Sequence, residues 1–203
     1  IDGEAASDMS GYSVSLSADG TRVAIGARYN NGVNGSESGH VRVYDYNGTS
    51  WVQIGEDIDG EAVDDRSGYS VSLSADGKIV AIGAYGNDGV NGSDSGHVRV
   101  YELDGSTWIQ IGEDIDGEAA DDNSGTSVSL SADGTRVAIG AEYNDGVNGS
   151  DSGHVRVYEL DRRRIDPYKI KLDIQNNLTQ DQNIKLVNSS GYLIPFNIPE
   201  EDS

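Results

Sequence analysis

SGYSVSLSADGTRVAIGARYNNGVNGSESGHVRVY, residues 10–44, is the stretch that decides the fold, because it returns almost unchanged at 67–101 and at 124–158. Each copy begins 57 residues after the previous one. A second shared segment lies between the copies, TSWVQIGEDIDGEA at 49–62 and STWIQIGEDIDGEA at 106–119. A fixed period of this size is typical of solenoids, propellers and arrays. The properties of one repeat therefore bound what the whole chain can form.

Four short strands are predicted in each repeat. In the first repeat they cover Gly11–Ser17, Arg22–Ala27, His40–Tyr46 and Trp51–Gly55, where apolar and polar residues alternate. Asp19-Gly20 predicts a two-residue hairpin between the first two strands, because this pair supplies the positive φ angles of such a turn. Those strands are then antiparallel neighbours, which excludes a parallel β-helix. No segment has a helical period with caps, so we expect almost no helix.

A four-stranded antiparallel meander of this size is the blade of a β-propeller. The first strand is rich in Gly and Ser, which suits the crowded position near the propeller axis. Trp51 and Trp108 on the outermost strands can cover the neighbouring sheet. One blade cannot bury both of its faces, so blades must stack on one another. The predicted fold is all-β, with a propeller-repeat domain over 1–161 and blades at about 11–57, 68–114 and 125–161.

The third blade is predicted to be incomplete, because Arg162-Arg163-Arg164 stands near the place of its expected fourth strand. Residues 162–203 have a different composition and contain three β-type runs. We expect this tail either to supply the missing strand or to form a β-type arm that docks on another subunit by strand addition.

The number of blades leaves three arrangements open, since closed propellers have about four to eight blades. The chain is cut from a longer array, or a protein partner or identical chains complete the ring, or the blades stack openly. The sequence begins at Ile1, inside a repeat, without an initiator Met or a signal-like segment. We therefore expect a processed or excised piece of a longer protein.

The formal net charge of −21 resides in the repeats. Residues 1–161 carry 8 Lys and Arg against 29 Asp and Glu, whereas residues 162–203 carry 6 of each. Such a surface repels nucleic acid and attracts cations, so no nucleic-acid partner is expected; it is equally a device for solubility. No apolar run reaches the ~18 residues of a membrane span. There is no cysteine, so disulfides contribute nothing.

The loops between the second and third strands are candidate Ca²⁺ sites. They read NNGVNGSESG at 30–39 and NDGVNGSDSG at 87–96 and 144–153, and Ca²⁺ binds carboxylate and amide oxygens in Gly-rich loops. The alternative is an ordinary solvated loop, since these residue types also favour turns. The first copy has Asn31 and Glu37 in place of two aspartates and is expected to bind more weakly. The candidate ligands are Asp88, Asn91, Asp94, Asp145, Asn148 and Asp151.

Other polar positions recur with the repeat. The acidic segment at 56–61, with Asp64 and Asp65, is interpreted as a solvated rim or a second cation site, and its copy lies at 113–118. A histidine begins the third strand of every repeat, at His40, His97 and His154, and a hydrogen-bonding role is expected there. Asn-x-Ser/Thr triplets predict glycans if the protein is secreted. They begin at Asn34, Asn47, Asn91, Asn148, Asn177 and Asn188.

The succession Gly-Tyr-Ser-Val, Asp-Gly, Val-Ala-Ile-Gly-Ala and Gly-His-Val-Arg-Val-Tyr resembles the FG-GAP repeat, the blade unit of integrin α-subunit propellers. The resemblance covers residues 1–161, and it is nearest to divergent arrays in surface proteins of algae and marine microbes. Ser10 and Arg28 depart from the Phe and Pro of the family pattern. The family's Asp-rich calcium loop is cut to Ser-Ala-Asp-Gly, so its usual calcium site is not carried over.

The resemblance implies a non-catalytic extracellular or surface module for adhesion, binding or assembly. The alternatives are a structural subunit of a fibre or particle docked by its tail, and a propeller-framed enzyme acting on polysaccharides. An enzyme needs an acid or base that is not repeated, and the near identity of the repeats argues against one. We therefore expect no catalytic residues, and no cofactor other than Ca²⁺.

Overall fold

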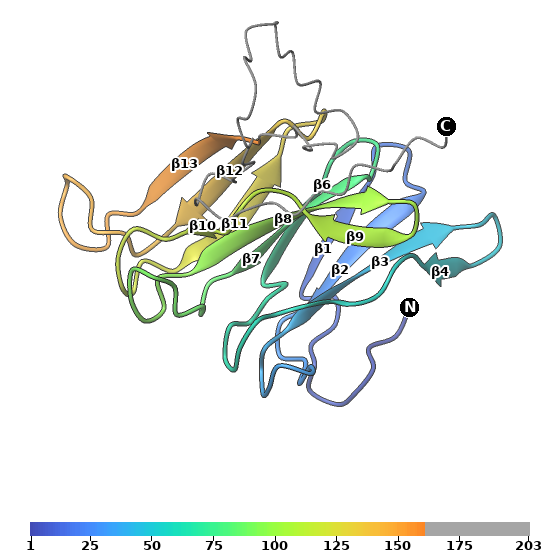
Figure 1. Cartoon of the computed structure of the whole chain (residues 1–203), viewed down its shortest axis with the longest axis horizontal. Helices are drawn as coiled ribbons and strands as arrows, with labels where there is room; N and C mark the ends of the chain where they lie inside the picture. The colour runs from blue at the N-terminus through green and yellow to red at the C-terminus, as the bar shows by residue number, and fades with distance from the viewer. Residues whose placement is uncertain (161–203) are drawn as a thin grey trace, which may run out of the picture. The chain divides into compact units, whose positions relative to one another are not determined.

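The computed structural model describes residues 1–160, so both predictions for the tail at 162–203 lie outside the described residues. Within the described part the chain is all-β, with no helix, and each repeat forms one antiparallel sheet, which confirms the predicted class (Figure 1). The first sheet holds β1 (Ser13–Leu16), β2 (Arg22–Ala27), β3 (His40–Tyr46), β4 (Trp51–Gln53) and β5 (Ile58–Asp59). The second holds β6 (Ser70–Leu73), β7 (Ile79–Ala84), β8 (His97–Asp104), β9 (Thr107–Gln110) and β10 (Ile115–Asp116), and the third holds β11 (Ser124–Leu130), β12 (Arg136–Ala141) and β13 (His154–Glu159).

The fourth strand of each complete blade is divided into two pieces, which the sequence did not predict. β4 pairs with the end of β3 and stops at Gln53, short of the predicted Gly55. Gly55 has a φ of 78°, which suits glycine and turns the chain out of the sheet. The chain then returns as β5, where Ile58 and Asp59 pair with the beginning of β3. The segment predicted to lie between blades therefore contains part of a blade.

The hairpin between β1 and β2 is wider than predicted. Residues 17–21 connect the strands, and only Gly20 of the Asp-Gly pair has a positive φ, of 70°. The Asp19 carboxylate closes this loop by accepting hydrogen bonds from the Ser17 hydroxyl and the Thr21 amide. These bonds lower the pKa of Asp19 to about 2. A side chain that closes a five-residue loop replaces the two-residue turn.

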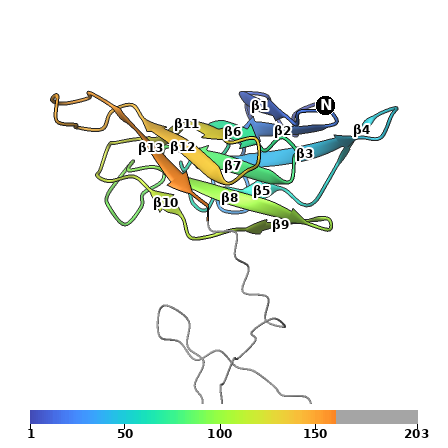
Figure 2. The same ribbon diagram turned by 90° about the horizontal axis from the view of Figure 1, so that it is seen from above.

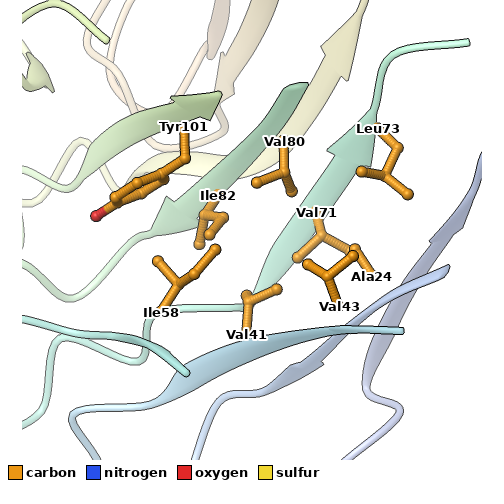
Figure 3. Packing of buried hydrophobic residues seen from close by; sticks show 9 residues of the cluster. All are labelled: Ala24, Val41, Val43, Ile58, Val71, Leu73, Val80, Ile82 and Tyr101. Carbon is orange, nitrogen blue, oxygen red and sulfur yellow. The ribbon is translucent and has the colours of Figure 1, made fainter. Parts of the chain in front are cut away.

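The blades stack through their apolar faces. Val41, Val43 and Ile58 of the first blade pack against Val71 and Ile82 of the second in one buried cluster (Figure 3). The predicted role of the outer tryptophan holds for Trp108, whose indole N–H donates to the carbonyl of Ile54 in the first blade at 3.0 Å. Trp51 instead packs against Tyr46 of its own sheet, with the two rings tilted by 46°.

The second blade is covered on both faces. The face opposite the first blade presents Ile79, Val98 and Val100, which pack against Val137 and Ile139 of the third blade. The alternation of side chains along a strand allows this, because successive residues point to opposite faces. β7 is buried at every position because its sheet lies between the other two sheets.

The serines of the innermost strands connect neighbouring blades. β1, β6 and β11 lie side by side along one edge of the stack (Figure 2). The Ser13 hydroxyl donates to the carbonyl of Gly68 at 2.7 Å, and Ser70 makes the same bond to Gly125. The Ser15 hydroxyl accepts the amide of Leu73. The Ser-rich character of the first strand is therefore explained by hydrogen bonds between sheets.

The second strands approach the next blade so closely that only glycine fits. A Cβ added to Gly83 would lie 2.1 Å from the carbonyl oxygen of Gly125, and Gly26 meets Gly68 in the same way. Gly140, the equivalent in the third blade, has no backbone of another blade among its nearest atoms.

Gly83→Ala is expected to lower the free energy of unfolding by about 1–3 kcal/mol, because the second and third sheets must move apart to admit a methyl group. Gly140→Ala is the matched control, since its methyl group meets only Ser127 of the same sheet. Denaturant unfolding of both variants measures the difference. Equal losses at the two positions would contradict close sheet packing as the reason for glycine.

Candidate functional sites at the blade junctions

Each junction between blades is held by a buried aspartate. Asp65 is 2% exposed, and its carboxylate accepts hydrogen bonds from the amides of Glu61 and Ala62 and from the side chain of Asn87. Asp8 and Asp122 have the same place in their repeats. These bonds fix the course of the chain as it passes from one blade to the next.

A second contact of each junction joins an acidic residue to the next blade. Glu61 follows β5, and its carboxylate lies 3.2 Å from the Arg99 guanidinium on β8. Arg99 also donates to the carbonyl of Asp59 at 2.7 Å. The same pairs recur as Glu4 with Arg42 and in the third repeat, where Arg156 pairs with Glu118. The second and third blades thus each bind the end of the fourth strand that precedes them.

The histidine at the start of the third strand faces the same junction. His97 is 1% exposed, and its Nδ1 lies 3.7 Å from Asp114 and 3.9 Å from Glu61. Burial, helped by the charge of Arg99, lowers the pKa of His97 to about 4, so the imidazole is neutral at pH 7 and these contacts are not ion pairs. The expected hydrogen-bonding role is wrong for Nε2 of His97, which is buried without a hydrogen-bond partner.

The acidic segment predicted as a solvated rim is only partly solvated. Asp64 is exposed, but Asp65 is buried in the junction. Asp57 accepts a hydrogen bond from Gln53 at 2.7 Å and lies 3.5 Å from His40. Sequence reasoning considered the histidines and the acidic segment separately. The constant separation of Glu4 from His40, and of Glu61 from His97, is the signal that connects them.

The loops predicted to bind Ca²⁺ are exposed, and their candidate ligands take part in closing the loop. The Asp88 carboxylate accepts the amide of Asp94 at 2.9 Å, and Asp145 accepts that of Asp151 in the same way. Asn31 closes the first loop through its amide oxygen, so closure needs no charge.

The amides of these loops reach the next junction. Asn91 donates to the carbonyl of Gly117 at 2.7 Å, and Asn34 donates equivalently to Gly60. Asn34, Asn91 and Asn148 are exposed. Both the Ca²⁺ sites and the glycans stay predictions, and a glycan on Asn34 or Asn91 would share the nitrogen that makes this bond.

The outer faces of the stack differ sharply from the inner ones. Val14 and Leu16 on the first blade are 63% and 59% exposed, whereas their equivalents on the second blade are 9% and 7% exposed. On the third blade Val155 and Val157 are 68% and 64% exposed, against 0% and 2% for Val98 and Val100. A hollow of about 530 Å³ opens on the third blade beside Ser127, Gly140 and His154. Sequence reasoning expected such faces without locating their residues.

The profile of the FG-GAP repeat matches residues 2–44, 57–101 and 115–158, which together are more than half of the sequence. The chain belongs to the FG-GAP repeat family. Each match includes the junction segment and the three strands that follow it. The family unit therefore begins at the junction, and the outer hairpin piece that contains β4 or β9 lies outside it.

Solved structures with similar folds are distant in sequence. A candidate 6-phosphogluconolactonase of Bacteroides uniformis is 14% identical over 73% of this chain, with a TM-score of 0.50. The hydrazine synthase of Kuenenia stuttgartiensis is 13% identical over 78% of the chain, with a TM-score of 0.45. The FG-GAP chain spans 36% of the length of either protein. No curated protein matches the sequence, and the described residues contain no helix that could cross a membrane.

Asp65→Ala is expected to reduce the free energy of unfolding by about 3 kcal/mol, because the amides of Glu61 and Ala62 and the buried side chain of Asn87 lose their acceptor. Asp64→Asn is the control: it removes a charge from the exposed neighbouring residue, and asparagine tolerates the φ of 65° found there. Thermal and denaturant unfolding give the comparison. A similar loss in both variants would show that the burial of Asp65 is unimportant.

Millimolar Ca²⁺, added after treatment with EDTA, is expected to raise the melting temperature if the 87–96 and 144–153 loops bind it. The variant Asp88→Asn/Asp145→Asn should lose this shift and still fold, since Asn31 closes the first loop. An unshifted wild type, or a variant that shifts as much as the wild type, would exclude these loops as Ca²⁺ sites.

Proposed function

We propose that this FG-GAP chain is a non-catalytic scaffold for binding and assembly, whose two outer faces bind blades of the same kind, and that it works outside the cell or on a cell or particle surface. The occupant that we propose in solution is a second copy of the chain. The observation that carries the proposal is the exposure of Val155 and Val157, which are buried at the equivalent positions of both preceding blades.

The two outer faces are complementary halves of the internal interface. The face of the third blade repeats the Val-x-Val pattern that packs against Val71 and Leu73 in the first junction. The face of the first blade repeats those partners as Val14 and Leu16. Burial of each such side chain contributes about 1.5–3 kcal/mol. A third blade stacked on the first blade of another copy would therefore reproduce an interface that the chain already forms twice.

The polar groups of the outer faces also support a second copy of the chain as the partner. In each internal junction the carbonyl of a glycine in the next blade accepts a hydrogen bond from a serine hydroxyl and lies against a strand glycine. In the second junction the carbonyl of Gly125 accepts from Ser70 and lies against Gly83. The hollow beside Ser127 and Gly140 is the equivalent place on the third blade. Gly11 of a second copy is the residue that matches it in sequence.

The beginning of the chain offers a further complementary piece. Ile1-Asp2 repeats the sequence of β5, and Glu4 already contacts Arg42 as Glu61 contacts Arg99. In the first sheet, β5 pairs with the start of β3. In a head-to-tail pair of copies, Ile1-Asp2 of one copy would pair with the start of β13 in the other, as β5 pairs with β3.

The contact is heterologous, so two single variants that block opposite faces should rescue each other. Leu16→Asp blocks the first blade and Val157→Asp blocks the third, and both side chains are exposed, so the fold is retained. The wild type should self-associate with increasing concentration, and each variant alone should stay monomeric. An equimolar mixture of the two variants should form a 1:1 heterodimer in analytical ultracentrifugation.

A wild type that stays monomeric at its solubility limit would overturn the proposal, as would a mixture that forms no heterodimer. Association that survives both substitutions would place the contact on another surface. Lys78→Asp changes charge on an exposed residue just before β7 of the second blade and should leave the association of the wild type unchanged.

A further inference from the structure

We propose that the first two blades each bind one divalent transition-metal cation of the zinc class at the start of their third strands, β3 and β8. The ligands are an imidazole nitrogen of that strand, a carboxylate oxygen from the segment that leads into the blade, and a carboxylate oxygen from the residues between the two pieces of the blade's fourth strand. The first set is Glu4, His40 and Asp57, and the second is Glu61, His97 and Asp114.

The three ligand atoms of each set lie within 4.8 Å of one another. His97 Nδ1 is 3.7 Å from Asp114 Oδ2 and 3.9 Å from Glu61 Oε2. In the other set His40 Nδ1 is 3.5 Å from Asp57 Oδ2 and 3.9 Å from Glu4 Oε2. Bonds of about 2.0–2.2 Å to tetrahedral zinc place ligand atoms roughly 3.3 Å apart. The nitrogen–oxygen distances of both sets exceed this separation by only a few tenths of an ångström.

The imidazole supplies an independent observation. His97 is 1% exposed, and its distances to both carboxylates exceed those of a hydrogen bond. The other ring nitrogen, Nε2, is buried without a hydrogen-bond partner among the described residues. A buried polar ring without a hydrogen bond is costly unless another ligand satisfies it.

Neighbouring side chains orient both carboxylates toward the imidazole. Arg99 holds Oε1 of Glu61 at 3.2 Å, which leaves Oε2 facing His97. Gln110 donates to Oδ1 of Asp114 at 2.7 Å, which leaves Oδ2 facing His97. Such contacts to the second oxygen of a ligand fix the geometry of metal sites. The outer position of Asp114, whose side chain is 31% exposed, gives an ion access from solvent.

The ligand set favours a transition metal over Ca²⁺. A nitrogen ligand with two carboxylates suits Zn²⁺ and its neighbours, whereas Ca²⁺ takes six to eight oxygens. Two complete sets are present in the described residues. In the third repeat Glu118 lies 3.4 Å from His154, but the sequence has Lys171 at the position 57 residues after Asp114. We therefore assign two sites to the chain.

Titration of the EDTA-treated chain with ZnCl₂ should show two equivalents of tight binding by calorimetry and a rise in the melting temperature. Asp114→Asn should remove one equivalent, and Asp57→Asn/Asp114→Asn should weaken binding at both sites at least tenfold. Glu56→Gln/Glu113→Gln is the matched control, because it removes the same charge from exposed residues adjacent in sequence. The control should bind two equivalents with wild-type affinity.

Substitution of Co²⁺ for Zn²⁺ gives a readout of the ligands themselves. Visible d–d absorption and a shift of the His97 ring protons in NMR spectra are expected with the wild type and should be lost in the double variant. Zinc binding that the double variant retains, or a wild type that binds no zinc, would overturn the proposal. Each set lies within one chain, so the Leu16→Asp and Val157→Asp variants should each bind two equivalents as well, whether or not the wild type self-associates.

Discussion

The burial of each sheet face against the next sheet is the interaction on which the rest of this structure depends. A single blade exposes two apolar faces. Within residues 1–160 only the middle blade has both covered, by Val43 and Ile58 on one side and Val137 and Ile139 on the other. The other features serve this contact. Glycine at 26 and 83 lets the sheets approach, and Ser13 and Ser15 satisfy backbone groups along the inner edge. Stability in such stacks is a sum of repeats and their interfaces.

The junction segments carry the polar part of the same contact. Between the first and second blades, Asp65 fixes the course of the chain. Arg99 on the second blade contacts the carbonyl of Asp59, at the end of β5, and the carboxylate of Glu61, which follows β5. Because these groups come from two blades, they take their positions only when the blades are stacked. The set of Glu61, His97 and Asp114 belongs to the first of these junctions, so an ion bound there would join the second blade to the segment that follows the first.

The strands and the stacking could be predicted from the sequence, since both follow from local alternation and from repetition. The predicted bounds of Arg22–Ala27 and His40–Tyr46 are those of β2 and β3. The return of the chain as β5 could not be predicted, because a two-residue strand has no periodicity and is defined by its distant partner β3. The contact of Glu61 with His97 was missed for the same reason: it joins residues of different repeats. The loop of Asp19 was misjudged because the side chain, and not the backbone pair, closes it.

The division of the fourth strand has a consequence for how such proteins grow. Because β5 and the residues that contact the next blade follow one another in the chain, one full repeat of this sequence encodes a blade together with the segment that joins it to the next. Duplication of the unit then adds a layer whose upper and lower surfaces already match, and no compensating substitution is needed. Arrays can lengthen or shorten by whole units during evolution, and the near identity of the three copies is what recent events of that kind would leave behind.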